Sequence, residues 1–237
     1  MGTVDPTMNR KWALGLVVVA VAGCGGSSSS PSVSPTAPRV RALNDILDAT
    51  SVSVDVSGTK LLDKRPFSFA STYVAIAAGS KAVTFKDGPS GASLLAVPVT
   101  LENSKFYDAM GLGSVAKGIH VAFLTDDHVT VAGTTKVRVV NGLEDNASVD
   151  VYVTLPGTAD LTGLTPNETG LAFADGASPY LSVTPGSYTV WITPAGVPGT
   201  LLVGNNETFA DATNVTLIAV KTPSGLQIQE IGDQPAF

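Results

Sequence analysis

Residues 39–56 read RVRALNDILDATSVSVDV, and residues 136–153 read KVRVVNGLEDNASVDVYV. The second stretch aligns with the first at a shift of 97 positions, without a gap. Self-similarity of this kind predicts two copies of one structural unit. Eight of the 18 aligned positions are identical, namely Val40/Val137, Arg41/Arg138, Asn44/Asn141, Asp48/Asp145, Ser51/Ser148, Val52/Val149, Val54/Val151 and Val56/Val153.

The repeated stretch and the residues after it predict β-structure. Valine alternates with serine or aspartate over residues 51–56, and this period of two is typical of a half-buried strand. Each copy continues with short apolar runs separated by turn residues, a pattern that predicts a β-sandwich. Residues 73–76 and 81–85 are expected to form a hairpin, as are residues 180–183 and 188–192.

Two local features refine this expectation in the first copy. Residues 44–50 are polar and rich in Asn and Asp, so we expect a loop there. Residues 94–101 are apolar and predict a strand, but they include Pro98. Because proline cannot donate a ladder hydrogen bond, this strand is expected at a sheet edge or a bulge.

The N-terminal segment has the pattern of an export signal. Arg10 and Lys11 precede an apolar run of 11 residues, WALGLVVVAVA. This run is too short to span a hydrocarbon core of about 30 Å as a helix. Residues 1–23 are therefore expected to be a signal peptide, with either Met1 or Met8 as its true start.

The end of this segment, VAGC at residues 21–24, resembles the bacterial lipobox. The resemblance implies that the Cys24 thiol receives a diacylglycerol, that cleavage precedes Cys24, and that the new amino terminus is acylated, for example with palmitate. Gly25 replaces the Asp that retains such lipoproteins at the inner membrane. We expect a lipid-anchored protein of the bacterial cell envelope, at the outer membrane. An ordinary secretory signal with an incidental cysteine is the alternative.

A linker and two domains are expected to follow. Residues 24–38 contain the lipidated Cys24 and the uncharged stretch GGSSSSPSVSPTAP, which is typical of a flexible tether. A coil of this length reaches about 20 Å. The repeat then divides the chain into a first β-sandwich domain at residues 39–130 and a second at residues 131–237.

Ordered motifs in both copies resemble a known family, the domain-of-unknown-function family numbered 4397. The resemblance implies an immunoglobulin- or transthyretin-like sandwich in each copy and brings no catalytic residues. Members occur in exported bacterial proteins, often in tandem. The second copy lacks the GTKLL-type motif. The matching motifs lie at residues 41–44, 53–56, 58–62 and 73–83 in the first copy, and at residues 138–141, 149–152 and 180–190 in the second.

Composition limits the possible functions. The chain has 237 residues, and its net charge of −6 argues against nucleic acid, which requires a basic surface. Charged residues make up only 14% of the chain and aromatic residues 6%, whereas small and β-branched residues are plentiful. This balance favours an all-β extracytoplasmic protein. Cys24 is the single cysteine, so no intrachain disulfide can form.

The sequence indicates that the protein is not an enzyme, and we expect no catalytic residue, no cofactor and no metal ligand. It has only two histidines, His120 and His128, and no G-x-S-x-G elbow that would present a serine nucleophile. Residues Asp126, Asp127 and His128 are a less favoured candidate for a metal-dependent or enzymatic centre. A single cluster of this kind is a weak pattern, and a solvated turn between the domains is the preferred interpretation.

Other candidate binding residues have ordinary explanations. Tyr73, Tyr180 and Trp191 could stack on sugars, but each lies in an expected strand, so burial is favoured. Acidic loop residues could bind Ca²⁺, but they lack the EF-hand pattern, and solvated carboxylates are favoured. These acidic residues are Asp48, Glu144, Asp145, Asp175 and Asp211.

Residues 154–177 are ten residues longer than their counterpart, residues 57–70. Because loops carry function more often than strands do, this segment is the best candidate for a binding site, with a decorative insertion as the alternative. We expect a non-enzymatic envelope protein with a role in adhesion, spacing or ligand binding, and with an envelope protein or a glycan as its partner. An accessory subunit of an envelope complex is the alternative.

Overall fold

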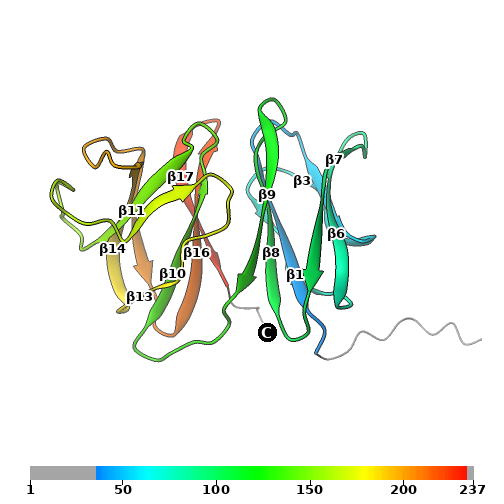
Figure 1. Ribbon diagram of the computed structural model, residues 1–237, viewed down its shortest axis with the longest axis horizontal. Helices are drawn as coiled ribbons and strands as arrows, with labels where there is room; N and C mark the ends of the chain where they lie inside the picture. Colours follow the sequence, from blue (N-terminus) through cyan, green and yellow to red (C-terminus); the bar gives the residue numbers. More distant parts are fainter. Residues whose placement is uncertain (1–35, 234–237) are drawn as a thin grey trace, which may run out of the picture. The chain divides into compact units, whose positions relative to one another are not determined.

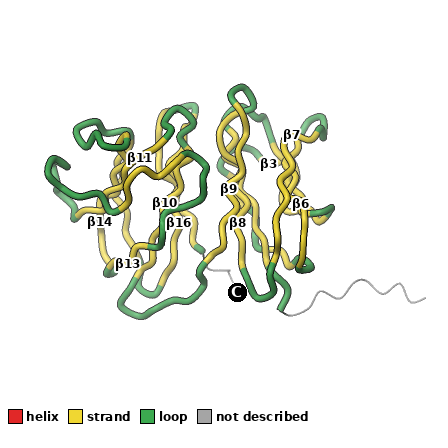
Figure 2. The backbone as a smooth tube through the Cα atoms, in the orientation of Figure 1, coloured by secondary structure: helices red, strands yellow, loops and turns green. Residues whose placement is uncertain are grey.

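The computed structural model describes residues 36–233, and these residues form strands and loops without a helix (Figure 2). No helix long and apolar enough to cross a membrane occurs in this part of the chain. The expected signal peptide, Cys24 and most of the tether lie outside the described residues.

The strands form two β-sandwiches in tandem, which we call repeat 1 (β1 to β9) and repeat 2 (β10 to β17), as Figure 1 shows. In repeat 1 the inner sheet has the order β4-β1-β8-β9, with β5 also paired to β1, and the outer sheet has the order β3-β2-β6-β7. The strands of repeat 1 are β1 (Arg39–Ile46), β2 (Val52–Val56), β3 (Thr59–Arg65), β4 (Phe69–Ala70), β5 (Val74–Ala75), β6 (Gly79–Asp87), β7 (Ser93–Leu101), β8 (Phe106–Ser114) and β9 (Gly118–Asp126).

Repeat 2 follows the same plan. Its inner sheet has the order β13-β10-β16-β17 and its outer sheet the order β12-β11-β14-β15. The fold is therefore all-β, with two tandem β-sandwiches. The strands are β10 (Thr135–Gly142), β11 (Ser148–Thr154), β12 (Glu168–Ala172), β13 (Leu181–Val183), β14 (Gly186–Pro194), β15 (Val203–Phe209), β16 (Thr213–Thr222) and β17 (Gly225–Gly232).

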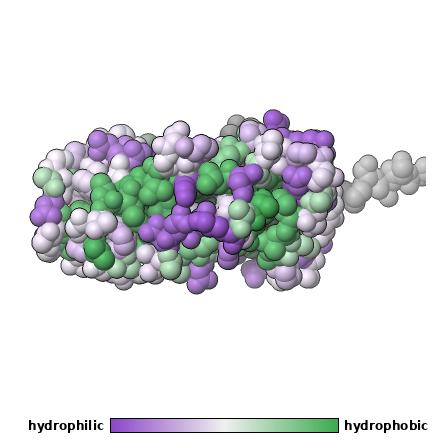
Figure 3. All heavy atoms as spheres, turned by 90° about the horizontal axis from the view of Figure 1, so that it is seen from above, coloured by the Kyte–Doolittle hydropathy of each residue, from purple (hydrophilic) through white to green (hydrophobic). Residues whose placement is uncertain are grey.

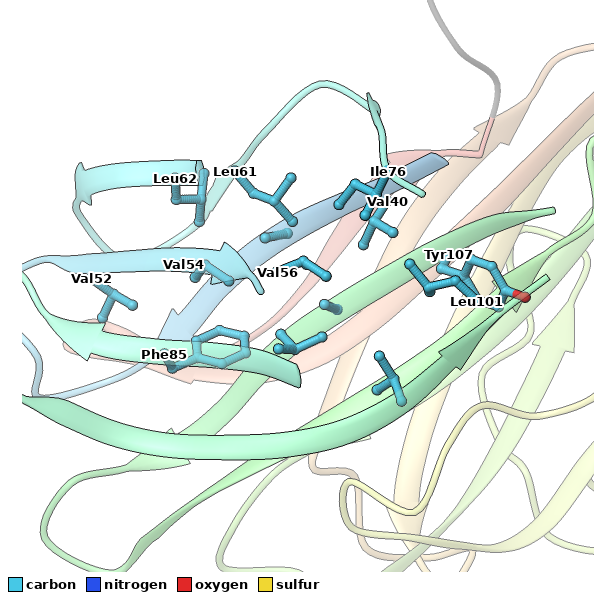
Figure 4. Packing of buried hydrophobic residues seen from close by; sticks show 14 of the residues in the cluster. Val40, Val52, Val54, Val56, Leu61, Leu62, Ile76, Phe85, Leu101 and Tyr107 are labelled. Atoms are coloured by element: carbon cyan, nitrogen blue, oxygen red, sulfur yellow. The ribbon is translucent and has the colours of Figure 1, made fainter. Parts of the chain in front are cut away.

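Each sandwich has its own apolar core between its inner and outer sheets. The alternating valines of β2 and β11 face these cores, as their period of two predicts. In repeat 1 the core also contains Phe85, which is fully buried. Figure 4 shows side chains from both sheets converging there, including Val40, Val52, Val54, Val56, Leu61, Leu62, Ile76, Phe85, Leu101 and Tyr107.

The repeated asparagines have a structural role at the end of the first strand of each repeat. The Asn44 side-chain oxygen accepts a hydrogen bond from the Ile46 N–H (3.2 Å), and its amide donates to the Arg65 carbonyl (3.1 Å). Asn141 accepts from the Leu143 N–H at 3.0 Å in the same way. Because buried backbone groups need partners, these side chains complete the ladder where the strand ends.

Two local expectations were wrong. The polar stretch after residue 43 begins inside a strand, because β1 continues to Ile46 and buries Asn44 completely. The two expected hairpins do not form either. β5 pairs with β1, whereas β6 pairs with β2 and β7, so the chain crosses from the inner to the outer sheet between them. β13 and β14 are divided in the same way. The edge position inferred from Pro98 is confirmed, since β7 ends its sheet.

One parallel pair lies at the centre of each inner sheet. β1 runs parallel to β8, which places Arg41 opposite Asp108. β10 runs parallel to β16, which places Arg138 opposite Thr216. The expected domain boundary at residue 130 remains a prediction, and it falls in the connection between β9 and β10.

Candidate functional site

The inner sheets of the two repeats pack against each other through a third apolar cluster. Alternation along β1 and β10 directs every second side chain away from the sandwich core and into this contact. On β1 these residues are Arg41, Leu43 and Asp45. The buried apolar members of the cluster are Leu43, Met110, Leu112, Ala122 and Leu124 from repeat 1, with Val140, Ile218 and Val220 from repeat 2.

Arg41 joins the two repeats at the centre of this contact. Its guanidinium makes a bidentate pair with Asp108 on the neighbouring strand, with Nη2 at 2.8 Å from Oδ2. The same Nη2 donates to Asp233 Oδ1 of repeat 2 at 3.0 Å, and Nη1 donates to the Gly232 carbonyl at 2.6 Å. All three charged side chains are at least 94% buried. Such charge-assisted hydrogen bonds are stronger than neutral ones.

Arg138 makes the equivalent contacts from repeat 2. Its Nη2 forms an ion pair with Asp126 of repeat 1, and its Nη1 donates to the Thr125 carbonyl at 2.9 Å. Within its own repeat, Nε donates to Thr216 Oγ1 at 2.7 Å, because threonine stands where repeat 1 has Asp108. Thr216 in turn donates to Asp233 at 2.8 Å.

These contacts form an isologous pattern, in which each repeat offers the same groups to the other. Arg41 reaches Asp233, and Arg138 reaches Asp126. Asp126 and Asp233 are separated by 107 positions, which is also the shift that relates Tyr73 to Tyr180. Pairs of this reciprocal kind are the mark of a two-fold interface. We call these two arginines, three aspartates and two tyrosines the ionic network.

The two tyrosines complete the ionic network. Tyr73 donates its hydroxyl proton to Asp126 at 2.5 Å, and Tyr180 donates to Asp233 at 2.8 Å. Their rings also lie under the guanidiniums, with Arg41 at 4.8 Å from the Tyr73 centroid and Arg138 at 4.9 Å from that of Tyr180. Hydrogen bonds and cation–π contacts therefore orient both arginines.

Burial and charge act in opposite directions on the pKa values of the network. Burial raises the pKa of Asp108 to about 6, although the Arg41 guanidinium lowers it. Burial also raises the pKa values of Asp126 and Asp233, against the effect of Arg138. Burial lowers the pKa of Arg41, but the hydrogen bond and charge of Asp108, together with Tyr73 and Asp126, raise it, and the net change is upward. Both arginines therefore remain charged, and they serve as the counter-ions of the carboxylates.

Carboxylate oxygens of Asp108, Asp126 and Asp233 lie within 4.8 Å of one another, a spacing that could hold a metal ion. The guanidiniums of Arg41 and Arg138 already lie among them and supply two positive charges. A protein cation therefore occupies the place that a metal would take. We assign this cluster a structural role.

The structure places the three side chains of the Asp126–His128 candidate in different surroundings, so they do not form one site. Asp126 points into the ionic network, while Asp127 pairs with Lys136 at 2.6 Å. His128 stacks on Phe106 with ring centroids 3.8 Å apart, and burial lowers its pKa. Neither ring nitrogen of His128 has a hydrogen-bond partner within the described residues. The neutral imidazole thus packs as an aromatic side chain beside the network.

The acidic loop residues mainly hold loops in place. Asp48 accepts hydrogen bonds from the Val115 and Ala116 N–H groups at 2.6 and 3.0 Å, and Asp211 accepts from the Gly133 N–H at 2.6 Å. Glu144 accepts from the Ser114 hydroxyl at 2.7 Å. These bonds tie each loop to a segment distant in the sequence, and the Ser114–Glu144 bond joins repeat 1 to repeat 2.

Asp145 forms a charged contact between the repeats at the surface. It pairs with Lys117 of repeat 1 and, at 2.7 Å, with Lys221 of repeat 2. The two lysines lower the pKa of Asp145 to about 2. On the face drawn in Figure 3, hydrophilic residues gather between two hydrophobic areas. Exposed pairs of this kind contribute little to stability by themselves.

The long segment at residues 154–177 contains β12 and two exposed leucines, Leu155 (69% exposed) and Leu164 (44%). Trp191 on β14 donates to Thr154 Oγ1 at 2.9 Å. Its ring is partly exposed. The three aromatic candidates are thus divided, because Tyr73 and Tyr180 belong to the ionic network and Trp191 lies beside the start of the long segment.

Sequence reasoning did not find the ionic network, although one signal for it was present. Arg41 and Arg138 are charged residues at matching positions, each between apolar neighbours, and Asp126 and Asp233 match at the shift of the tyrosines. A charge that recurs at a buried strand position requires a partner. Its partner could not be named, because Asp233 lies 192 residues from Arg41.

Comparisons with known structures give distant likenesses. A family 26 carbohydrate-binding module from Eubacterium rectale Amy13K, solved with maltoheptaose, is 10% identical, with coverage of 82% of this chain and 96% of that module and a TM-score of 0.27. Family 41 carbohydrate-binding modules from streptococcal virulence factors, studied for α-glucan recognition, are 11% identical, with coverage of 77% and 94% and a TM-score of 0.26. At such TM-scores these likenesses assign no ligand to this chain.

No curated protein matches the chain. A family model does match it twice, once in each repeat. The model of the domain of unknown function DUF4397 covers residues 38–152 and again residues 135–236. These segments contain the arginines, tyrosines and aspartates of the ionic network. The chain therefore belongs to the DUF4397 family, with one copy of the domain in each of its two repeats.

Proposed function

We propose that this protein is a lipid-anchored cell-envelope protein with a non-enzymatic binding or structural role. The supporting observation is the use that the molecule makes of its buried charges. In an enzyme such groups face a substrate and carry perturbed pKa values for that purpose. Here Arg41, Arg138 and their three aspartates face one another across the two repeats. They hold two sandwiches as one unit, which suits a spacer or a display module.

The anchor in this proposal is Cys24, at the end of the lipobox-like VAGC sequence. The described fold begins at residue 36, so only a short uncharged tether separates it from the anchor. Two or more acyl chains on one residue hold a protein stably to a membrane. The two repeats would then stand within about 20 Å of the bilayer surface, at the outer membrane.

The anchor is tested by labelling and fractionation in a diderm bacterial host. The wild-type protein is expected to incorporate labelled palmitate and to sediment with outer membranes. The Cys24→Ala variant should incorporate no label and leave the membrane fraction. Palmitate labelling that is unchanged in Cys24→Ala, or a wild-type protein recovered wholly as a soluble form, would contradict the anchor.

A second candidate function is that of an accessory subunit in an envelope complex. Exposed apolar side chains favour it, because large ones occur on loops of repeat 2. Leu155 and Leu164 lie in the long segment, and Val197 and Leu201 lie between β14 and β15. Their exposed fractions range from 44 to 69%. Exposed apolar side chains on loops are candidates for contact with a partner.

Cross-linking in living cells separates these two functions. If the protein is a subunit of a complex, cross-linking should recover the same protein partner in every experiment. The yield of that cross-linked partner should fall for the variant Leu155→Ser/Leu164→Ser. Val115→Ser is the matched control, because Val115 is 50% exposed but belongs to repeat 1. Recovery of the protein without a partner, before and after these changes, would favour the spacer or a glycan-binding role, which binding assays on envelope polysaccharides would then test.

A further inference from the structure

Besides the exchange of Asp108 for Thr216, the two-fold correspondence between the repeats fails at a second place in their contact. Asp45 of β1 corresponds to Gly142 of β10 at the shift of 97, and Gln229 of β17 corresponds to Ala122 of β9 at the shift of 107. The Gly142 side is closed, since a Cβ there would lie 2.8 Å from the Ala219 carbonyl oxygen. On the other side of the contact, the equivalent positions carry two polar side chains, Asp45 and Gln229. The arginines, the tyrosines and the pair Asp126/Asp233 of the ionic network do recur.

A cavity of about 150 Å³ lies on the Asp45 side. Leu43 and Asp45 of β1 line it, and the intervening Asn44 does not, which indicates that the Asp45 side chain points inward. Across the contact, Gln229, Glu230 and Ile231 of β17 line it from repeat 2, and burial raises the pKa of Glu230. Ser68, which immediately precedes β4, adds a hydroxyl to the lining. The cavity therefore combines oxygen atoms from both repeats.

Asp45 is 96% buried, yet neither of its carboxylate oxygens has a hydrogen-bond partner among the described residues. The Gln229 Nε2 group is also without a partner of normal geometry. Burial raises the pKa of Asp45 to about 7, and hydrogen bonding from the Gln229 side chain lowers it less. A buried carboxylate whose neighbouring amide is poorly aligned is costly, and buried charges are normally paired or bound to a metal.

The charges of the contact also remain unbalanced. Arg41 and Arg138 supply two positive charges, and they are engaged with the three aspartates of the ionic network. Asp45 is a fourth buried carboxylate, and no arginine or lysine pairs with it within residues 36–233. With all four ionised, these buried groups carry a net charge of −2, which attracts a cation to the cavity that Asp45 lines.

We propose that this cavity binds one partly hydrated divalent cation of the Mg²⁺ or Mn²⁺ class, with Asp45 as its charged ligand. Such ions keep several waters and need only one or two carboxylates from the protein. A water occupies about 30 Å³, so 150 Å³ has room for an ion that retains about four of its waters. The oxygens of Gln229 and Ser68 supply neutral ligands. Because Asp45 and Gln229 belong to different repeats, the ion joins repeat 1 to repeat 2.

The test uses the full-length protein, purified in detergent and freed of metal with a chelator. Mn²⁺ serves as the probe, and its binding is followed by electron paramagnetic resonance and by calorimetry at pH 8. We expect one saturable ion per chain. Asp45→Asn keeps the shape of the side chain and should weaken binding at least tenfold. Asp63→Asn is the control, because the Asp63 side chain is 58% exposed, and it should leave binding unchanged.

Two further measurements keep the outcome clear. Protons compete for Asp45, so Mn²⁺ affinity should fall about tenfold for each pH unit below about 7. Mg²⁺ should raise the melting temperature of the wild type and not that of Asp45→Asn, a variant that should itself fold because it removes an unpaired buried charge. Equal Mn²⁺ binding by wild type and Asp45→Asn, or no saturable binding at millimolar Mn²⁺, would overturn the proposal.

Discussion

The sequence determines which way the side chains of Arg41 and Arg138 point, but the tertiary structure determines which groups they bind. Each stands on a strand whose neighbours face an apolar core, and each is directed to the opposite face by alternation. Removal of one partner from a buried ion pair leaves the other charge without compensation, which costs more than the pair contributes. The ionic network should therefore be sensitive to single substitutions.

Arg138→Met should lower the free energy of unfolding by about 3–5 kcal/mol, because Asp126 would remain buried and unpaired. Lys60→Met is the matched control, since Lys60 pairs with Asp63 at the surface with a side chain that is 62% exposed. Its effect should be below about 1 kcal/mol. Urea denaturation measures both. A loss for Arg138→Met that is no larger than the loss for Lys60→Met would show that the network does not stabilise the contact.

Asp45 should make stability depend on pH near neutrality. Its pKa is about 7 in the folded protein against an ordinary value of 3.8, so the folded state binds more protons between these values. Stability therefore falls as pH rises from 4 to 7, by up to about 1.4 kcal/mol per pH unit in chelator. The difference between wild type and Asp45→Asn isolates this effect. A difference that stays constant from pH 5 to pH 8 would contradict it.

At the scale of elements, β8 shows why a glycine is needed inside a strand. Gly111 faces the core of repeat 1, and a Cβ there would lie 2.5 Å from the ring of Phe85 on β6. Phe85 is fully buried and cannot move aside. The missing side chain allows the inner sheet to approach the outer sheet at this point, as glycines in strands often do.

Gly111→Ala should destabilise the protein by about 1–3 kcal/mol through overpacking against Phe85. Gly199→Ala is the control, because no atom lies within 4 Å of the added methyl group. It should change the free energy of unfolding by less than about 0.5 kcal/mol. Thermal and urea unfolding of the two variants would decide, and equal stabilities would show that the core can make room for the methyl.

At the scale of the whole described fold, the two repeats are expected to unfold together. Their contact combines the apolar cluster of the inner sheets with the ionic network, both of them buried. Separation of the repeats would expose apolar area and leave charges unpaired, so neither repeat gains by unfolding first.

Two probes can test this cooperativity. Trp191 lies on β14 and reports on repeat 2, and the chain's other tryptophan, Trp12, lies in the expected signal peptide. Far-ultraviolet circular dichroism reports on both repeats. In the processed protein, urea transitions followed by tryptophan fluorescence and by dichroism should coincide. Two transitions with different midpoints would show that the contact between the repeats is weak.

Strand alternation, proline positions and the internal repeat in the sequence predict much of the architecture. The alternating valines at residues 51–56 predict a strand with one buried face, and Pro98 predicts an edge, because both depend on the geometry of one strand. The gapless repeat predicts two similar units. The failed hairpins show the limit, since residues 73–76 and 81–85 are adjacent in sequence but join different sheets.

The sequence by itself therefore determined the β-class, the tandem organisation and the family, since these depend on periodicity and on motif order. The tertiary structure alone decided which charges meet. Arg41 finds Asp108 through a parallel pairing of strands that are distant in the chain, and finds Asp233 across the contact of two sandwiches. It also decided that Asp45 lines a cavity. Such contacts depend on how sheets pack, and no local pattern encodes that packing.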